Sequence, residues 1–233
     1  MAENQFQKLT SEPAVFLLLL ISLLLLQFIL PRDVASQIAN IYGLMFIGDY
    51  VLWSLGSDIK PQSGNSAKSL LHAGIAFAVL FMLYGFVQTS VQSVLPTANE
   101  QVSLLQTIKQ SIITFNAEEI DIRQYKFGQF FLYAIFIGFL ETRFIGRLYG
   151  NSAKIFNINI SDLKSAKNWA LVLIVSLIFM YFHLKVRGYN NNIGLAMTLL
   201  FMIVSLILIG RAKEMESANY LHIFWNGVAV AYG

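Results

Sequence analysis

Four polar side chains lie inside stretches of the chain that are otherwise apolar: Glu141, His183, His222 and Asn226. An ionisable group within a membrane helix costs about 2.5–3.5 kcal/mol to insert, so each one is a candidate for function. A buried carboxylate beside an imidazole can activate a water molecule, with the carboxylate accepting the proton. Glu141 is therefore predicted to be a general base and His183 its partner.

His222 and Asn226 are four residues apart, which places both on one face of a helix. From that face an imidazole and a carboxamide could donate hydrogen bonds to the same oxygen atom, so the pair is a predicted oxyanion hole. Arg143 and Arg147 lie close to Glu141 in the sequence and are predicted to contact substrate or to form a structural ion pair. No complete set of metal ligands is apparent, and neither a metal nor a cofactor is expected.

Composition excludes several classes of protein. The 233 residues are 56% hydrophobic and only 12% charged, and the mean hydropathy is +0.61, which indicates a membrane protein with the lipid bilayer as a partner. The absence of cysteine excludes disulfides, thiolate metal sites and a cysteine nucleophile. The net charge of +3 comes from basic residues in short loops rather than along one stripe, so no nucleic acid partner is expected.

Seven apolar stretches predict an all-α, polytopic transmembrane helix bundle of about seven spans. They cover residues 13–30, 37–55, 69–95, 127–149, 169–184, 193–210 and 218–232. Between the third and fourth, residues 96–126 have the spacing of an amphipathic helix lying at the membrane interface. The chain is thus predicted to be one integral membrane domain, 1–233, with N-terminal spans in 1–95 and motif-bearing spans in 127–233.

The distribution of basic residues predicts the topology. Pro31, Arg32 and Asp33 are expected to mark an exit into water after a retained first span. With the N-terminus inside, ten of the sixteen Lys and Arg residues fall on the inner side: Lys8, Lys60, Lys68, Arg143, Arg147, Lys154, Lys164, Lys167, Arg211 and Lys213. We therefore expect an integral protein of the plasma (inner) membrane with a cytoplasmic N-terminus.

Two motifs formed by these residues resemble the CAAX protease and bacteriocin-processing (CPBP) family of intramembrane endopeptidases, which includes the type II CAAX prenyl proteases. The family pattern is Glu-Glu-x-x-x-Arg, then Phe-x-x-x-His, then His-x-x-x-Asn. Phe179 to His183 matches the second motif and His222 to Asn226 the third. In the first motif Glu141 stands for the first Glu, Thr142 replaces the second, and Gly146 occupies the Arg position. A literal match lies upstream, where Glu118 and Glu119 precede Arg123.

The resemblance implies a metal-independent, membrane-embedded peptidase that acts on a membrane-associated or prenylated peptide or protein. It implies that Glu141 and His183 activate the water, while His222 and Asn226 hold the oxyanion. Glu118 and Glu119 are the alternative residues for the first motif.

Other readings of the same residues stay open. Glu141 could instead pair with Arg143 or Arg147, and His222 and Asn226 could simply bond helices together. Asp49 and His72, the other ionisable groups in apolar stretches, are expected to serve packing or inter-helix hydrogen bonds. For the whole chain, the alternatives are a non-catalytic immunity or scaffold protein of the same fold, or a proton-coupled transporter that uses Glu141 and His183.

Helix geometry conflicts with the predicted pair. Straight antiparallel helices over 127–149 and 169–184 would put Glu141 about 21 Å from the membrane face near which His183 lies, at about 1.5 Å per residue. The two side chains can meet only if the Glu141 helix is broken or re-entrant, and Gly138 and Gly146 are the expected break points.

Overall fold

A computed structural model describes residues 12–29, 32–56, 59–60, 65–94, 135–186 and 192–232. These residues form seven helices: α2 (Glu12–Ile29), α3 (Arg32–Ser54), α4 (Ser66–Val94), α7 (Gly138–Ile155), α8 (Ala166–Val186), α9 (Asn192–Ala212) and α10 (Glu216–Tyr232). Each predicted apolar stretch overlaps one of them, and the described residues form no strand, so the all-α prediction is confirmed. The predicted interfacial helix at 96–126 lies outside the described residues.

Three helices are long and apolar enough to cross a membrane, which indicates a membrane protein. The qualifying segments are Ser66–Tyr84 of α4, Ala166–Leu184 of α8 and Ile193–Ala212 of α9, with mean hydropathies of 1.6, 1.6 and 2.6. The apolar part of α2, Pro13–Leu25, is shorter than these segments. The figure of about seven spans therefore stays a prediction.

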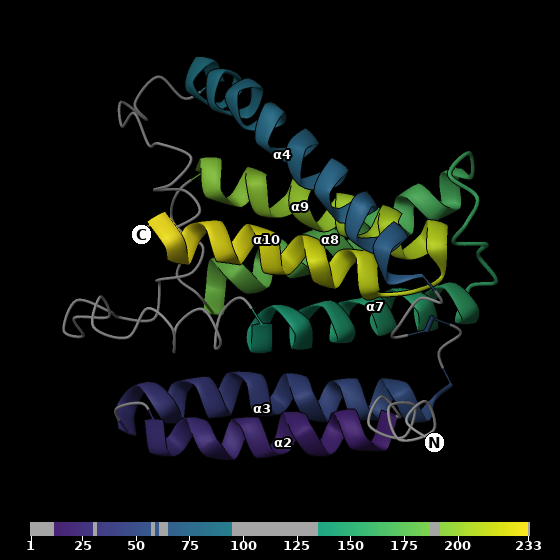
Figure 1. The fold of residues 1–233 in the computed structure, drawn as a ribbon. Helices are drawn as coiled ribbons and strands as arrows, with labels where there is room; N and C mark the ends of the chain where they lie inside the picture. Colours follow the sequence, from purple (N-terminus) through teal and green to yellow (C-terminus); the bar gives the residue numbers. More distant parts are fainter. Residues whose placement is uncertain are drawn as a thin grey trace.

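The helices form a bundle in which α7 lies between two groups (Figure 1). An antiparallel hairpin of α2 and α3 lies along one side of α7, and α8, α9 and α10 lie along the other, with α4 slanting across α9 and α10. Successive described helices run in alternating directions. The end of α3, the start of α4, the end of α7, the start of α8, the end of α9 and the start of α10 consequently meet at one end of the bundle.

Exposed basic side chains gather at that end, which we call the basic end: Lys60, Lys68, Lys154, Lys164, Lys167, Arg211 and Lys213. Short contacts hold it together. The Lys154 ammonium donates to the Gly56 carbonyl at 3.0 Å, and the Lys60 backbone N–H donates to the Lys213 carbonyl at 3.0 Å. The Ser161 hydroxyl donates to the Gly210 carbonyl at 3.0 Å. Distant parts of the sequence thus form one surface.

The structure defines two helix features more closely. Helix α3 begins at Arg32, before the predicted stretch at 37–55, so Arg32 and Asp33 lie in its first turn. Helix α7 is preceded by a π-helical turn at 135–137 but continues without a break through Gly146. A Cβ atom at Gly146 would lie 3.3 Å from atoms of both Ile209 and Met215. That glycine therefore permits close helix packing and is not a break point.

Candidate functional site

Glu141 lies in the first turn of α7 and is completely buried. The Tyr42 hydroxyl of α3 donates a hydrogen bond of 3.1 Å to its Oε1 atom. On the other side, Nε2 of His222 in α10 lies 3.3 Å from Oε2. The carboxyl group thus joins three helices, and its nearest imidazole belongs to the third predicted motif.

The next residue of α7 also contacts His222. Thr142 Oγ1 lies 3.0 Å from Nδ1 of His222 and donates to the Gly138 carbonyl, one turn earlier, at 2.8 Å. The Phe201 ring packs against the imidazole in an edge arrangement, with centroids 4.8 Å apart. Both ring nitrogens of His222 therefore have polar neighbours on α7, while an aromatic ring restricts the imidazole.

Asn226 lies beside His222, as their four-residue spacing predicts. A Cβ atom placed on Gly138 would be 3.2 Å from Cγ and Cδ2 of His222 and 3.3 Å from Nδ2 of Asn226. Because Gly138 has no side chain, its backbone can lie close to His222 and Asn226, and the residue is buried there. The structure therefore brings Glu141, His222 and Asn226 to the same part of the bundle.

His183 is buried near the end of α8, and its described contacts lie within that helix. Its Nδ1 is 2.9 Å from the Phe179 carbonyl oxygen, and its ring centroid is 4.2 Å from that of Phe179. Tyr149 of α7 donates to Asn168 of α8 at 2.6 Å. Because these helices are antiparallel, counting from that contact places His183 about 10 Å beyond the level of Glu141 along the bundle. The pairing of His183 with Glu141 stays a prediction.

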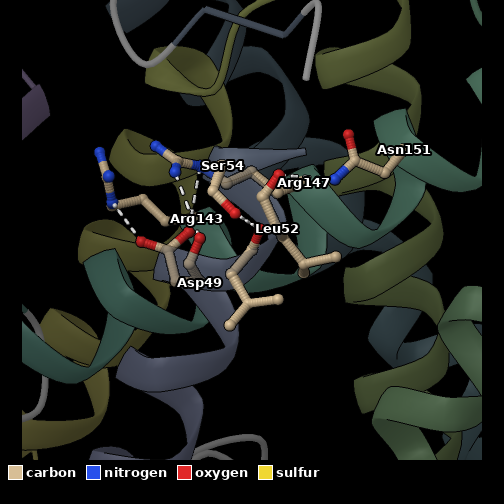
Figure 2. Close-up of polar contacts among 7 residues, drawn as sticks. Asp49, Leu52, Ser54, Arg143, Arg147 and Asn151 are labelled. Atoms are coloured by element: carbon tan, nitrogen blue, oxygen red, sulfur yellow. Dashed lines mark hydrogen bonds and ion pairs between the residues drawn. The ribbon is translucent and has the colours of Figure 1, made fainter. Parts of the chain in front are cut away.

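Arg143 and Arg147 share a carboxylate on α3 (Figure 2). Arg143 Nε lies 3.1 Å from Oδ2 of Asp49, and Arg147 Nε lies 3.1 Å from Oδ1. Arg147 also donates to the Asp49 carbonyl at 3.3 Å. All three side chains are buried. The described ion-pair partner of both arginines is therefore Asp49, whereas the prediction named Glu141. Both arginines are buried, so they are not among the exposed basic residues of the predicted inner side.

Further along this face of α7, toward the basic end, more side chains contact α3 and α2. Asn151, four residues after Arg147, donates to the Leu52 carbonyl at 2.7 Å (Figure 2). The guanidinium groups lie over the Phe16 ring of α2, with Cζ of Arg143 5.2 Å and Cζ of Arg147 5.4 Å from its centroid. Polar groups spaced one turn apart on α7 therefore fix α3 along it, and Phe16 attaches α2. This framework holds Glu141 in register with Tyr42.

Sequence reasoning missed Tyr42 and Thr142 as members of the site. Asp49 carried a usable signal, because it is an acid in an apolar stretch and two arginines lie in another. Thr142 was recognised only as a departure from the family motif. Tyr42 carried no signal, since an aromatic residue in an apolar helix is ordinary and its contact is 99 residues away.

Glu118 and Glu119, the alternative residues for the first motif, lie outside the described residues. Among the residues that are described, no three His, Asp or Glu side chains gather closely enough to hold a metal ion.

Comparisons with protein-family models, with curated proteins and with solved structures gave no match.

Proposed function

We propose that this chain is an intramembrane endopeptidase that hydrolyses a peptide bond in a membrane-associated or prenylated peptide or protein, with Glu141 as the general base. The observation that carries the proposal is the buried contact of 3.3 Å between Glu141 Oε2 and His222 Nε2, with Asn226 beside it. A carboxyl group and an imidazole in contact can accept, hold and return a proton, which is what hydrolysis requires.

The proposed reaction uses only groups of the chain. Glu141 takes a proton from water, and the hydroxide oxygen attacks the scissile carbonyl carbon. A proton from the Glu141–His222 pair is delivered to the leaving nitrogen as the C–N bond breaks, and the proton taken from water remains between Oε2 and Nε2. Asn226 donates to the oxyanion. The described contacts favour His222 as the imidazole partner of Glu141, which differs from its role in the family.

The membrane arrangement is part of the proposal. The seven described helices alternate in direction (Figure 1), as consecutive spans must. We assign the basic end to the cytoplasm, because basic residues accumulate in cytoplasmic loops. Helix α2 begins at the same end, so the N-terminus is also cytoplasmic. Glu141 then lies in the first turn of α7, at the end of that helix away from the basic end.

A second candidate function is a non-catalytic membrane protein of the same fold, such as an immunity or scaffold factor. One observation favours it: the Glu141 side chain is fully buried, with Tyr42 on one oxygen and His222 at the other. A purely structural carboxyl group can be buried among contacts of this kind. Substrate access to Glu141 would require movement of the surrounding helices.

The test is cleavage of a membrane-anchored peptide library by purified full-length protein in detergent. We expect Glu141→Gln to reduce the rate by about 10²–10⁴-fold, the usual contribution of a general base. His222→Ala is expected to reduce it comparably, and a chelator to leave it unchanged. Glu216→Gln is the matched control, because Glu216 is also a buried acid in the first turn of a helix, yet its described bond is to Tyr220 at the basic end.

The outcomes separate the two candidate functions. Cleavage that survives Glu141→Gln would contradict the assigned base. If the wild-type protein cleaves no peptide while remaining folded, the non-catalytic function is favoured.

A further inference from the structure

His222 is held by two consecutive residues of α7. Its Nδ1 atom lies 3.0 Å from Thr142 Oγ1, and its Nε2 atom lies 3.3 Å from Glu141 Oε2. Rotation of the imidazole by half a turn would break both contacts. Gly138 on one side and Phe201 on another leave the ring little space for any other orientation. The position that departs from the family motif, Thr142, is therefore one of the two polar anchors of the histidine.

The hydrogen bonds of Thr142 limit where protons can be. A hydroxyl group has one proton to donate and two lone pairs to accept with. The Gly138 carbonyl can only accept, and Thr142 donates to it at 2.8 Å, which is a common bond of threonine in a helix. Oγ1 must then accept from His222, so Nδ1 carries a proton.

This arrangement has a consequence for Glu141. With Nδ1 protonated, a neutral His222 presents a lone pair at Nε2 toward Oε2, and two lone pairs 3.3 Å apart repel. One proton between the two atoms removes the repulsion. The pair then consists of either a carboxylic acid and a neutral imidazole or a carboxylate and an imidazolium, and Tyr42 donates to the other carboxyl oxygen in both cases.

We infer that Thr142 is a positioning residue, which keeps the proton of His222 on Nδ1 and directs Nε2 at Glu141, so that the two residues share a single proton. The role of this proton in peptide hydrolysis rests on the proposed function, whereas its location does not. A glutamate at position 142, as in the family motif, would be an acceptor for the same Nδ1–H. Threonine supplies that acceptor without a second negative charge beside Glu141.

The experiment is ¹⁵N NMR of the full-length protein in nanodiscs, labelled at histidine. The chain has three histidines, and His222→Gln identifies the signal of interest by its loss. The shifts of the two ring nitrogens report which one is protonated. We expect wild-type protein and Thr142→Ser to show a protonated Nδ1, and Thr142→Val to show loss of that state.

Thr198→Val is the matched control. Thr198 is buried, and its hydroxyl donates to the carbonyl of a glycine four residues earlier at 2.9 Å, as Thr142 does. It lies on α9, and its described hydrogen bond is to that helix alone. The His222 signal should be unchanged in this variant. An unchanged His222 signal in folded Thr142→Val protein would overturn the inference.

A second readout links the inference to activity. If cleavage is found, Thr142→Val should lower kcat about tenfold or more with little change in KM, and Thr142→Ser should restore most of it. Equal loss in the Val and Ser variants would contradict positioning by the hydroxyl. Absence of cleavage by the wild type would count against the proposed function only, because the NMR result stands independently of turnover.

Discussion

At the scale of single residues, the Glu141 carboxyl group depends on a hydrogen bond from another helix. Tyr42 is fully buried and donates to Oε1 at 3.1 Å. Hydrogen bonds to charged groups contribute about 1.5–3 kcal/mol, and about 1.4 kcal/mol corresponds to tenfold in rate. We therefore expect Tyr42→Phe to lower kcat/KM for peptide cleavage at least about tenfold. Tyr149→Phe, which removes a buried hydroxyl bonded to Asn168 instead, should leave kcat/KM within about twofold. Equal kcat/KM in Tyr42→Phe and wild-type protein would contradict this role.

Gly138 allows a steric test of the same site. Its missing Cβ would lie 3.2–3.3 Å from atoms of His222 and Asn226, a distance that forces one of them to move. Gly138→Ala should therefore reduce cleavage by about an order of magnitude, because small misplacements of reacting groups are costly. Gly74→Ala is the control, since nothing lies within 4 Å of the Cβ it would add. This substitution should stabilise the helix by up to about 1 kcal/mol and leave cleavage activity unchanged. Normal cleavage by Gly138→Ala would contradict the proposed contact geometry.

The site was only partly predictable from sequence. The residues of the two matching motifs were identifiable, because polar groups in apolar stretches are rare, and the shared face of His222 and Asn226 followed from helical spacing. The contact between Glu141 and His222 was not predicted, because the sequence does not indicate which helix packs at the first turn of α7. The pairing of Glu141 with His183 stays a prediction.

At the scale of helices, α7 is the element that assembles the site. It carries Glu141 and Thr142 toward α10 while its Arg143 and Arg147 bind Asp49 of α3. Gly48, next to Asp49, permits the close approach, because a Cβ there would lie 2.6 Å from the Phe144 ring. The sequence predicted the existence of this helix but neither its first turn nor its end at Ile155, and the first turn determines which groups Glu141 meets.

The buried triad gives a stability prediction for this packing. Asp49→Asn would leave two buried guanidinium groups without their carboxylate, and breaking a buried ion pair costs about 3–5 kcal/mol. We expect that loss in the free energy of unfolding, measured by denaturation in detergent. Replacing all three groups with apolar residues, as Asp49→Leu with Arg143→Met and Arg147→Met, should recover most of it. Asp162→Asn, at an exposed turn, is the control. Wild-type stability in Asp49→Asn would show that the triad does not hold α3 to α7.

At the scale of the whole molecule, each predicted apolar stretch overlaps one described helix, whereas the number of spans stays a prediction. Among the described helices, α4, α8 and α9 meet the length and hydropathy expected of a span, while α3, α7 and α10 carry polar groups that bind helices together. These polar groups lie in the bundle interior and lower the mean hydropathy of the helices that carry them. Composition alone therefore cannot separate a functional span from a helix that remains outside the membrane.

The seven-span proposal can be tested by thiol labelling, because the chain contains no cysteine. With a membrane-impermeant maleimide, Lys68→Cys and Lys164→Cys at the basic end should react only from the cytoplasmic side. Asn192→Cys at the start of α9 and Tyr232→Cys at the end of α10 should react only from the opposite side. The Tyr232→Cys variant distinguishes seven spans from fewer. Its reaction from the cytoplasmic side would show that α10 does not cross the membrane.

Ile174→Cys provides the control that distinguishes lipid from water. Ile174 is 55% exposed on α8, along with Leu173, Leu177 and Ile178. An apolar face of this kind on a soluble protein would be an interaction surface, whereas on a span it faces lipid. The impermeant reagent should not reach Cys at this position from either side until detergent is added. Rapid labelling in intact membranes would place α8 in water and remove the physical basis for an intramembrane site.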